Sequence, residues 1–340
     1  MVKDYFNKYF NIDGKKIGQN EPTYIIAEAG SNHNGNIEQA KRLIDIAVEA
    51  QADAVKFQLF KSELLLKKKA EIKELKKYEF NRSWLKPLFN YCKKKKITFL
   101  ASVFDAESID LIYNLGVKAI KIASSENLKH ELLFIASRTK LPLIISTGMN
   151  NFADISESLE IIKNSGNKNV SLLQCTSIYP CEPQYLNLNV ISAFKNLYDF
   201  PIGFSDHSIG MSAPLIAIAK GAKVIEKHFT SNKLLKGPDH FYSLDSKELI
   251  NMVSEIRNCE KMMGSKIKDI QEHEYLKCRI NGLYAKNNIN KESKLKPSNI
   301  YNSFPCAGIS NRFEKLVVKF RAKNRIKKNS PIFWKDLKTK

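Results

Sequence analysis

The chain has 340 residues, 43% of them hydrophobic, with only 14 glycines and 11 prolines. This composition excludes a fibrous or largely disordered protein, and the length suffices for one large domain and a smaller one. The formal net charge of +20 comes mostly from lysine, in runs such as 93–96. Those runs lack the interleaved arginine and aromatic residues of a nucleic-acid-binding surface, so we expect no nucleic-acid partner.

Neither a membrane span nor a secretion signal is expected. No stretch approaches 18 apolar residues, and residues 1–16 lack an apolar centre. The six cysteines are scattered and form no C-x-x-C pair, as expected of reduced thiols. They are Cys92, Cys175, Cys181, Cys259, Cys278 and Cys306. The sequence therefore predicts a cytoplasmic protein without a membrane partner.

Eight short β-rich runs follow one another along the chain. They are residues 24–30, 53–60, 97–104, 118–124, 141–148, 169–176, 200–207 and 222–229. Helical patterns separate most of them, for example at 37–51, 108–116 and 152–166, and Gly116 is placed to end the second of these. Apolar strands that alternate with helices predict an α/β fold with a parallel sheet, and eight of them predict a (β/α)8 (TIM) barrel. An open dinucleotide-binding sheet is disfavoured because no G-x-G-x-x-G follows the first strand.

Polar residues occupy the C-terminal end of nearly every predicted strand. They are Glu28, Lys56, Gln58, Asp105, Lys121, Ser124, Glu126, Ser146, Thr147, Gln174, Thr176, Ser177, Ser205, Asp206, His207, Glu226 and His228. In a parallel barrel these ends converge on one pocket, where polar groups are costly unless they satisfy one another or a ligand. Two lysines with several serines favour a phosphate site. The alternatives are a lysine that only reaches solvent and a simple turn at 146–148.

Two histidines end the last two predicted strands, with one short helix-like segment between them. His207 and His228 therefore lie at the same end of neighbouring strands. Imidazole is the commonest transition-metal ligand, and two such groups leave coordination positions open for substrate and water. Two core histidines with hydrogen-bond partners are the alternative, and the surrounding acids and lysines favour the metal. Asp239, on the next loop, either faces this pocket or begins a turn.

Eight motifs, in this order, resemble those of the N-acetylneuraminate synthase family, which includes sialic, legionaminic and pseudaminic acid synthases and spore-coat polysaccharide proteins. They are AEAGSNHNG (27–35), DAVKFQ (53–58), KIASSE (121–126), STGM (146–149), QCTSIYP (174–180), FSDHSIG (204–210), EKHFT (226–230) and GPDH (237–240). The resemblance covers roughly residues 20–265. It implies a catalytic TIM barrel over 1–265, a linker over 266–277 and a small antifreeze-like (SAF, β-clip) sugar-capping domain over 278–340.

The resemblance also implies a reaction. Phosphoenolpyruvate would condense with an N-acyl hexosamine, either N-acetylmannosamine or a 2,4-diacetamido-trideoxyhexose, to give a nonulosonic (sialic-type) acid and phosphate. The enzyme would be a C–C bond-forming transferase with a divalent cation on His207 and His228, manganese being expected and magnesium or cobalt the alternatives. A homodimer is implied too, in which the small domain of one subunit caps the barrel of the other.

Residue roles follow from the matching positions. The family binds phosphoenolpyruvate at the positions of Lys56, Lys121, Ser124, Ser146 and Ser205. It has catalytic acids at Glu28, Glu126 and Asp239, and sugar contacts at Gln58, Ser177 and Tyr179. Glu28 would steady developing positive charge or take a proton from the attacking water. A Schiff-base aldolase using Lys56 or Lys121 is the competing mechanism, which the two histidines disfavour because it needs no metal.

Several residues expected to contact the sugar differ from those usual in the family. Phe304 stands where the small domain usually has an arginine, and a phenyl ring cannot replace a bidentate, charged donor. Arg312 is the candidate replacement in sugar binding. Ser125 and Ser177 stand where glycine and asparagine are usual. These departures predict an uncommon hexosamine, another aldose, or a relative that binds without turnover; an aldose phosphate would need a second phosphate site that the sequence does not reveal.

Overall fold

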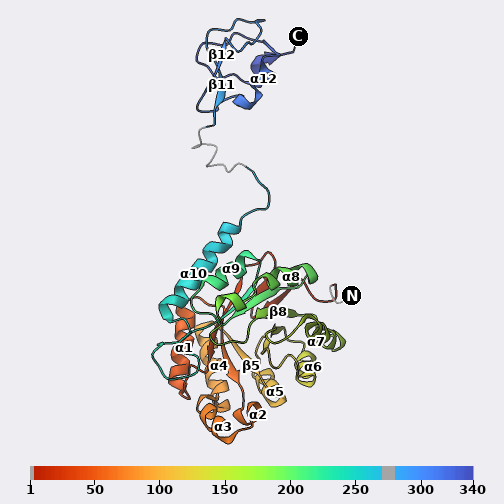
Figure 1. The fold of residues 1–340 in the computed structure, drawn as a ribbon, viewed down its shortest axis with the longest axis vertical. Coiled ribbons are helices and arrows are strands. Elements are labelled where there is room, and N and C mark those ends of the chain that lie inside the picture. Colours follow the sequence, from red (N-terminus) through yellow and green to blue (C-terminus); the bar gives the residue numbers. More distant parts are fainter. Residues whose placement is uncertain (1–3, 270–279, 340) are drawn as a thin grey trace. The chain divides into compact units, whose positions relative to one another are not determined.

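The computed structural model describes residues 4–269 and 280–339 and divides the chain into two compact units, residues 1–264 and 265–340 (Figure 1). Most of the predicted linker 266–277, together with Cys278, lies outside the described residues. The five cysteines within the described ranges are free.

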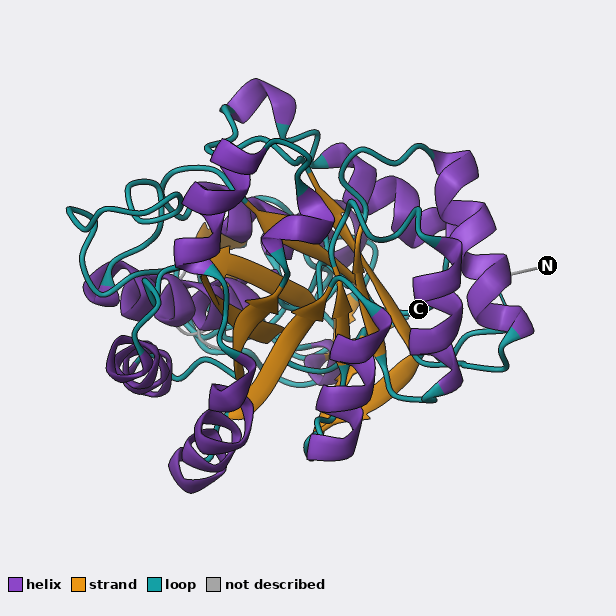
Figure 2. Cartoon of the chain, turned by 90° about the horizontal axis from the view of Figure 1, so that it is seen from below, coloured by secondary structure: helices purple, strands orange, loops and turns teal. Residues whose placement is uncertain are grey.

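The first unit is a closed barrel of eight parallel strands, which confirms the predicted (β/α)8 fold. In the order in which they pair, the strands are β10 (Val224–His228), β3 (Tyr24–Gly30), β4 (Ala54–Leu59), β5 (Thr98–Val103), β6 (Ile120–Ile122), β7 (Leu143–Ser146), β8 (Val170–Cys175) and β9 (Ile202–Asp206), which pairs with β10 again. Each of the eight predicted runs contains one strand. The strands are covered by helices, as Figure 2 shows.

Individual capping residues mark the ends of helices around the barrel, as helix α5 (Ala106–Leu115) illustrates. The helices are α1 (Ile37–Glu49), α2 (Ser62–Leu65), α3 (Lys69–Leu75), α4 (Leu85–Lys95), α5 (Ala106–Leu115), α6 (His130–Arg138), α7 (Phe152–Asn164), α8 (Asn189–Leu197), α9 (Ser212–Ala219) and α10 (Ser246–Met263). Helix α5 ends at Gly116, whose φ of +91° suits glycine, as predicted. At its start, Asp105 accepts a hydrogen bond from the Ser108 N–H at 2.7 Å. Asp105 therefore caps helix α5. None of the helices in the described part of the chain is long and apolar enough to cross a membrane.

A hairpin that the sequence did not reveal closes the N-terminal end of the barrel. Strands β1 (Tyr9–Ile12) and β2 (Lys15–Gly18) pair antiparallel. Their buried side chains Phe10, Ile12 and Ile17 join one apolar cluster with residues of the barrel strands, among them Tyr24 and Ile26. This end of the interior is therefore filled, and the C-terminal end is left for a site.

The second unit has its own small core. It contains β11 (Gly282–Ala285), β12 (Ile300–Ser303), α12 (Glu314–Val317), β13 (Arg321–Ala322) and β14 (Leu337–Lys338). The buried side chains include Leu283, Leu295, Ile309, Val317 and Ile332. Phe304, predicted to stand at the position of the family arginine, is 47% exposed.

Candidate active site

The barrel interior changes from apolar to charged within two residues along its strands. Ile26 pairs with Ala54, and two residues later Glu28 pairs with Lys56. Residues two apart in a strand point to the same side, so Glu28 and Lys56 lie in the interior directly above the apolar layer. The same step leads from Val224 to Glu226 in β10. A charged layer therefore crosses the C-terminal part of the barrel.

Four buried charges form the centre of this layer. The Lys56 Nζ lies 2.6 Å from the Glu28 Oε2 and 3.6 Å from the Glu226 Oε2. The Lys121 Nζ lies 3.7 Å from the Glu226 Oε1. All four side chains are at most 6% exposed. Because buried ions are costly unless paired, this arrangement is expected only where the charges satisfy one another or a ligand.

The two carboxyl groups of the layer differ in their proton affinity. Burial raises the pKa of Glu28, even though Lys56 acts against the rise. For Glu226, burial is outweighed by Lys121 and Lys56, which lower its pKa. The lysines differ as well, since burial lowers the pKa of Lys121, whereas Glu226 and Glu28 overcome burial and raise that of Lys56. Titratable groups whose pKa values are pushed apart are typical of acid–base sites.

Hydroxyl groups surround the two lysines. The Lys121 Nζ donates to the Ser146 Oγ at 2.7 Å, and the Ser205 Oγ donates to Glu226 at 2.8 Å. The Lys56 Nζ donates to the Ser102 Oγ at 2.7 Å. Four of the five residues predicted to bind phosphoenolpyruvate thus meet in one network around Glu226.

The fifth of these residues, Ser124, lies beside the network. Its Oγ accepts a hydrogen bond from the Gly148 N–H at 2.9 Å. A Cβ on Gly148 would come within 2.9 Å of the Ser124 Oγ and closer still to the Ser177 Oγ. Only glycine therefore allows these two hydroxyl groups to approach the end of β7.

The two histidines lie together at the ends of β9 and β10, as the sequence predicted. Their ring centroids are 5.5 Å apart, and the Tyr179 ring lies 4.0 Å from that of His207. The His207 Nδ1 is 2.8 Å from the Thr176 carbonyl oxygen, so it carries the proton and leaves the Nε2 lone pair free to bind a ligand. Burial holds the pKa of His228 well below its usual value, so this ring is neutral at neutral pH.

Two close imidazoles of this kind fit a divalent cation. Imidazoles at the ends of neighbouring strands are suitable ligands, and water and substrate would complete the coordination. Among the described residues, no group of three His, Cys, Asp or Glu is placed to hold a metal ion. A cation here would have His207 and His228 as its protein ligands.

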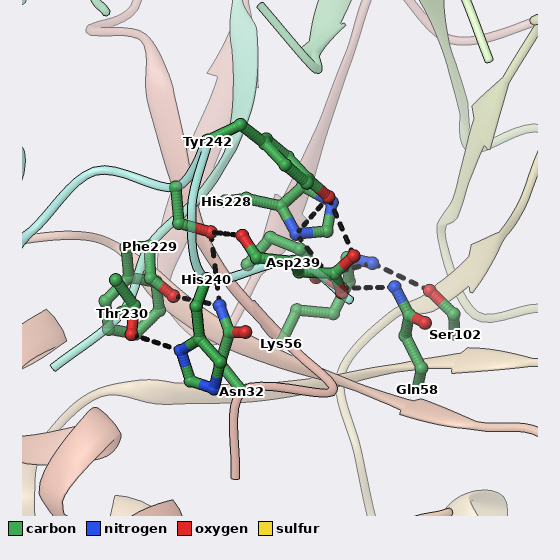
Figure 3. A network of polar contacts seen from close by, with 12 residues as sticks. Asn32, Lys56, Gln58, Ser102, His228, Phe229, Thr230, Asp239, His240 and Tyr242 are labelled. Atoms are coloured by element: carbon green, nitrogen blue, oxygen red, sulfur yellow. Dashed lines mark hydrogen bonds and ion pairs between the residues drawn. The ribbon is translucent and has the colours of Figure 1, made fainter. Parts of the chain in front are cut away.

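The loop after β10 brings Asp239 to His228 (Figure 3). The Asp239 Oδ2 lies 3.9 Å from the His228 Nδ1, and the Tyr242 hydroxyl donates to the Asp239 Oδ1 at 2.9 Å. Burial raises the pKa of Asp239, which the Tyr242 hydrogen bond partly offsets. Gly30, with a φ of +51°, permits the approach, since a Cβ there would lie 3.0 Å from the Asp239 Oδ2.

The same loop is tied to the end of β3. The Ser243 Oγ donates to the Asp239 carbonyl at 2.6 Å, and the Asn32 Nδ2 donates to the Ser243 Oγ at 3.1 Å. The Asn32 Nδ2 also donates to the Phe229 carbonyl at 2.8 Å. Asp239 is therefore held from both its side chain and its backbone.

Other predicted site residues differ in what they contact. The Gln58 Nε2 donates to the Glu28 Oε1 at 2.8 Å, which joins it to the charged layer. Glu126 is buried but pairs with Lys129 at 2.6 Å, and no described contact connects it to that layer. Arg312 belongs to the second unit, where its guanidinium carbon lies 4.6 Å from the Phe313 ring centroid.

Three residues of the site, Glu226, Ser102 and Tyr242, were given no role from the sequence. Glu226 and His228 are two apart in β10, and this spacing alone places both in the interior. Ser102 pairs with Lys121 in register, a relation that requires the sheet. Tyr242 lies on an irregular loop, where no periodicity indicates its direction.

A cavity of about 560 Å³ adjoins this end of the barrel. Thr147 and Ser177 line it on the side of the site, and the amide side chains of Gln174 and Asn187 also contribute. Part of its wall is apolar and comes from Phe152, Ile155, Val190 and Phe194. A cavity that combines apolar walls with a few polar groups is typical of a small-molecule site.

Comparisons with known proteins identify the family and relatives of this chain. A family model described as the NeuB family matches residues 43–268. The N,N'-diacetyllegionaminic acid synthase of Campylobacter jejuni is 38% identical, over 89% of this chain and 96% of that protein. The crystal structure of the spore coat polysaccharide biosynthesis protein SpsE of Bacillus subtilis is 35% identical with a TM-score of 0.68, covering 98% of this chain and 99% of that one. The N-acetylneuraminic acid synthetase of Leptospira borgpetersenii, in complex with citrate, is 36% identical with a TM-score of 0.76, covering 80% and 95%.

Proposed function

The chain belongs to the NeuB family and is an enzyme of the transferase type, and we propose that it condenses phosphoenolpyruvate with the open-chain aldehyde of an N-acyl hexosamine. One new C–C bond forms, water adds to the former C2 of phosphoenolpyruvate, and phosphate leaves. The product is a nonulosonic acid. The buried layer of two lysines and two glutamates beside two histidines is the observation that carries this proposal.

Anion binding is the task we assign to the lysines and hydroxyl groups. Lys56 and Lys121, with Ser124, Ser146 and Ser205, offer charged and neutral donors that suit a carboxylate and a phosphate. In the free protein Glu28 and Glu226 satisfy these lysines. An incoming trianion would compete with them for the same donors, which suits a phosphate that must later leave.

Proton transfer is the task we assign to Glu28. Its pKa is raised by burial, and Gln58 fixes one of its oxygens at 2.8 Å. A carboxylate with a raised pKa can accept a proton from the attacking water. Once that proton has left, Glu28 can pair with the adjacent Lys56 again. Asp239, held by Tyr242, lies on the side of the histidines and would contact the aldehyde end of the sugar.

His207 and His228 would hold a divalent cation, manganese being our assignment and magnesium or cobalt the alternatives. When bound, such a cation polarises a carbonyl oxygen. The aldehyde of the sugar would thus be placed next to Asp239 and Tyr179, while the cavity of 560 Å³ beside Ser177 has room for a substituted hexose.

The sugar is either N-acetylmannosamine or a 2,4-diacetamido-trideoxyhexose. Phe304 cannot make the charged contact that an arginine would make to the sugar. Its presence favours an acceptor whose binding depends less on that contact. We also propose that the second unit is the antifreeze-like domain, with Arg312 as a sugar contact. A cytoplasmic homodimer completes the proposal and rests on the family alone.

The test is phosphate release from phosphoenolpyruvate with manganese across a panel of sugars. The panel contains N-acetylmannosamine, 2,4-diacetamido-trideoxyhexoses, an aldose phosphate and no sugar, with His207→Ala and His228→Ala as controls. We expect release that depends on one N-acyl hexosamine and is lost in both variants. Binding of phosphoenolpyruvate and metal without release for any sugar would instead support a relative without turnover, the alternative that Phe304 favours.

A further inference from the structure

A buried ion pair lies behind the two histidines, and we call Lys227 and Asp206 the outer ion pair. The Lys227 Nζ is 2.6 Å from the Asp206 Oδ2, and both side chains are 0% exposed. The two residues pair in register across β10 and β9. Each directly precedes a histidine in the sequence, and because side chains alternate along a strand, the pair lies on the opposite face of the barrel wall from His207 and His228.

The outer ion pair also holds the turn that follows β9. The Asp206 Oδ1 accepts a hydrogen bond from the Ser208 N–H at 2.8 Å, and Lys227 donates to the Ser208 carbonyl. Strand β9 ends at Asp206, and its pairing with β10 ends there too. His207 therefore lies one residue beyond the ladder, and the outer ion pair restrains the backbone just before and just after it.

Stability alone does not account for this pair. Desolvation cancels much of the attraction between buried ions, so two apolar side chains of similar size are often as stable or more so. Apolar side chains, however, cannot form hydrogen bonds to both backbone groups of Ser208. Compared with apolar packing, the outer ion pair therefore adds a fixed backbone conformation on both sides of His207.

We propose that Lys227 and Asp206 are positioning residues that hold the His207 imidazole at the correct distance from His228 for a shared divalent cation. The inference rests on the proposed function of the two histidines. Groups behind metal ligands commonly act in this way, and their loss typically weakens metal affinity or activity by about 10- to 100-fold.

The experiment replaces both charges together in the full chain. In Asp206→Leu/Lys227→Met no unpaired buried charge remains, so the fold is expected to survive with a melting temperature near that of the parent. Mn²⁺ affinity is measured by calorimetry without substrates, and kcat and KM are measured separately. We expect the Mn²⁺ dissociation constant to rise about 10- to 100-fold and kcat/KM to fall with it. Asp206→Asn/Lys227→Met, which keeps an acceptor for the Ser208 N–H, serves if the first variant does not fold, and is expected to lose less affinity.

A matched control comes from the opposite end of the barrel. Asp53 is a buried carboxylate that accepts from the Ile25 N–H at 2.7 Å and pairs with Arg257 at 3.3 Å. Asp53→Asn should lower the melting temperature and leave Mn²⁺ affinity unchanged. Parent-like Mn²⁺ affinity in the double variant, or an equal loss in Asp53→Asn, would overturn the inference. A parent that binds no divalent cation would contradict the proposed metal site itself, and the inference with it.

Discussion

The two ends of the barrel interior use the same strands for opposite purposes. Near the N-terminal end the inward side chains are apolar: Ile26, Ala54, Leu100, Ala119, Ile144 and Val224. Two residues later on the same strands they are Glu28, Lys56, Ser102, Lys121, Ser146 and Glu226. The apolar layer, closed by the β1–β2 hairpin, stabilises the fold because its side chains are buried without any loss of hydration of polar groups. The charged layer costs free energy to bury, but its groups can bind a ligand. Changes at one end should therefore affect stability, and changes at the other should affect chemistry.

The largest effect is expected at Lys121. Lys121→Met removes a donor for the anionic substrate and leaves Glu226 with Lys56 as its described cationic partner. Truncating one partner of a buried charge pair costs about 2–5 kcal/mol, so kcat/KM for phosphoenolpyruvate should fall roughly 30- to 5000-fold. Steady-state kinetics checks this, with Lys118→Met, an exposed lysine before β6, as the control. Parallel losses in both variants would mean that general charge, not the layer, attracts the substrate.

The apolar layer should give the converse result. Leu100→Ala opens a cavity at a fully buried position, and such a change typically costs about 2–5 kcal/mol of stability. Urea unfolding measures the loss, while the KM for phosphoenolpyruvate should remain that of the parent at a temperature where the variant is folded. A large rise in KM would show that the two layers are not separable.

His33 is a histidine at the charged end of the barrel, but it contributes to packing and not to the site. It is fully buried among the rings of Phe57, Phe80 and Trp84, and burial lowers its pKa to about 4. The unfolded chain, with a pKa of 6.5, binds a proton that the folded chain excludes, so this contribution to stability is lost as the pH falls from about 6.5 toward 4. Between pH 7 and pH 5 the loss should be about 2 kcal/mol.

Unfolding by urea at these two pH values tests this assignment. The parent should lose more stability than His33→Asn over this interval, and the difference should be close to the stated value. An identical pH dependence in both proteins would show that another group is responsible.

The smallest effect is expected at Tyr242. Tyr242→Phe removes the hydroxyl that fixes Asp239 and keeps the buried ring. Loss of one hydrogen bond to a carboxylate should lower kcat about tenfold, with the KM for phosphoenolpyruvate unchanged. If KM rose and kcat did not, Asp239 would belong to phosphoenolpyruvate binding instead.

The barrel was predictable from sequence because its strands are continuous apolar runs separated by helices. Residues 53–60, for example, contain β4 at Ala54–Leu59, and Gly116 ends α5 as expected. The hairpin β1–β2 was not found, since two four-residue strands give too weak an alternation.

For the site, the position of the lysines and histidines at the C-terminal ends of predicted parallel strands was enough to bring them together. Asp105 and Glu126 were grouped with the strand-end residues, but each makes a contact to a residue three positions further on, where Asp105 caps helix α5 and Glu126 pairs with Lys129. Tyr242 was missed because it lies on an irregular loop, where no periodicity indicates its direction. The role of Arg312, in the second unit, remains a prediction.

The proposed reaction transfers all three carbons of phosphoenolpyruvate into the sugar. Incubation of the protein and manganese with ¹³C₃-labelled phosphoenolpyruvate and the active hexosamine, followed by mass spectrometry, tests it directly. We expect a 2-keto-3-deoxy acid that carries all three labelled carbons, formed in equal amount to the phosphate released. Labelled pyruvate with phosphate, and no label in any sugar, would contradict it and make the charged layer a site of hydrolysis instead.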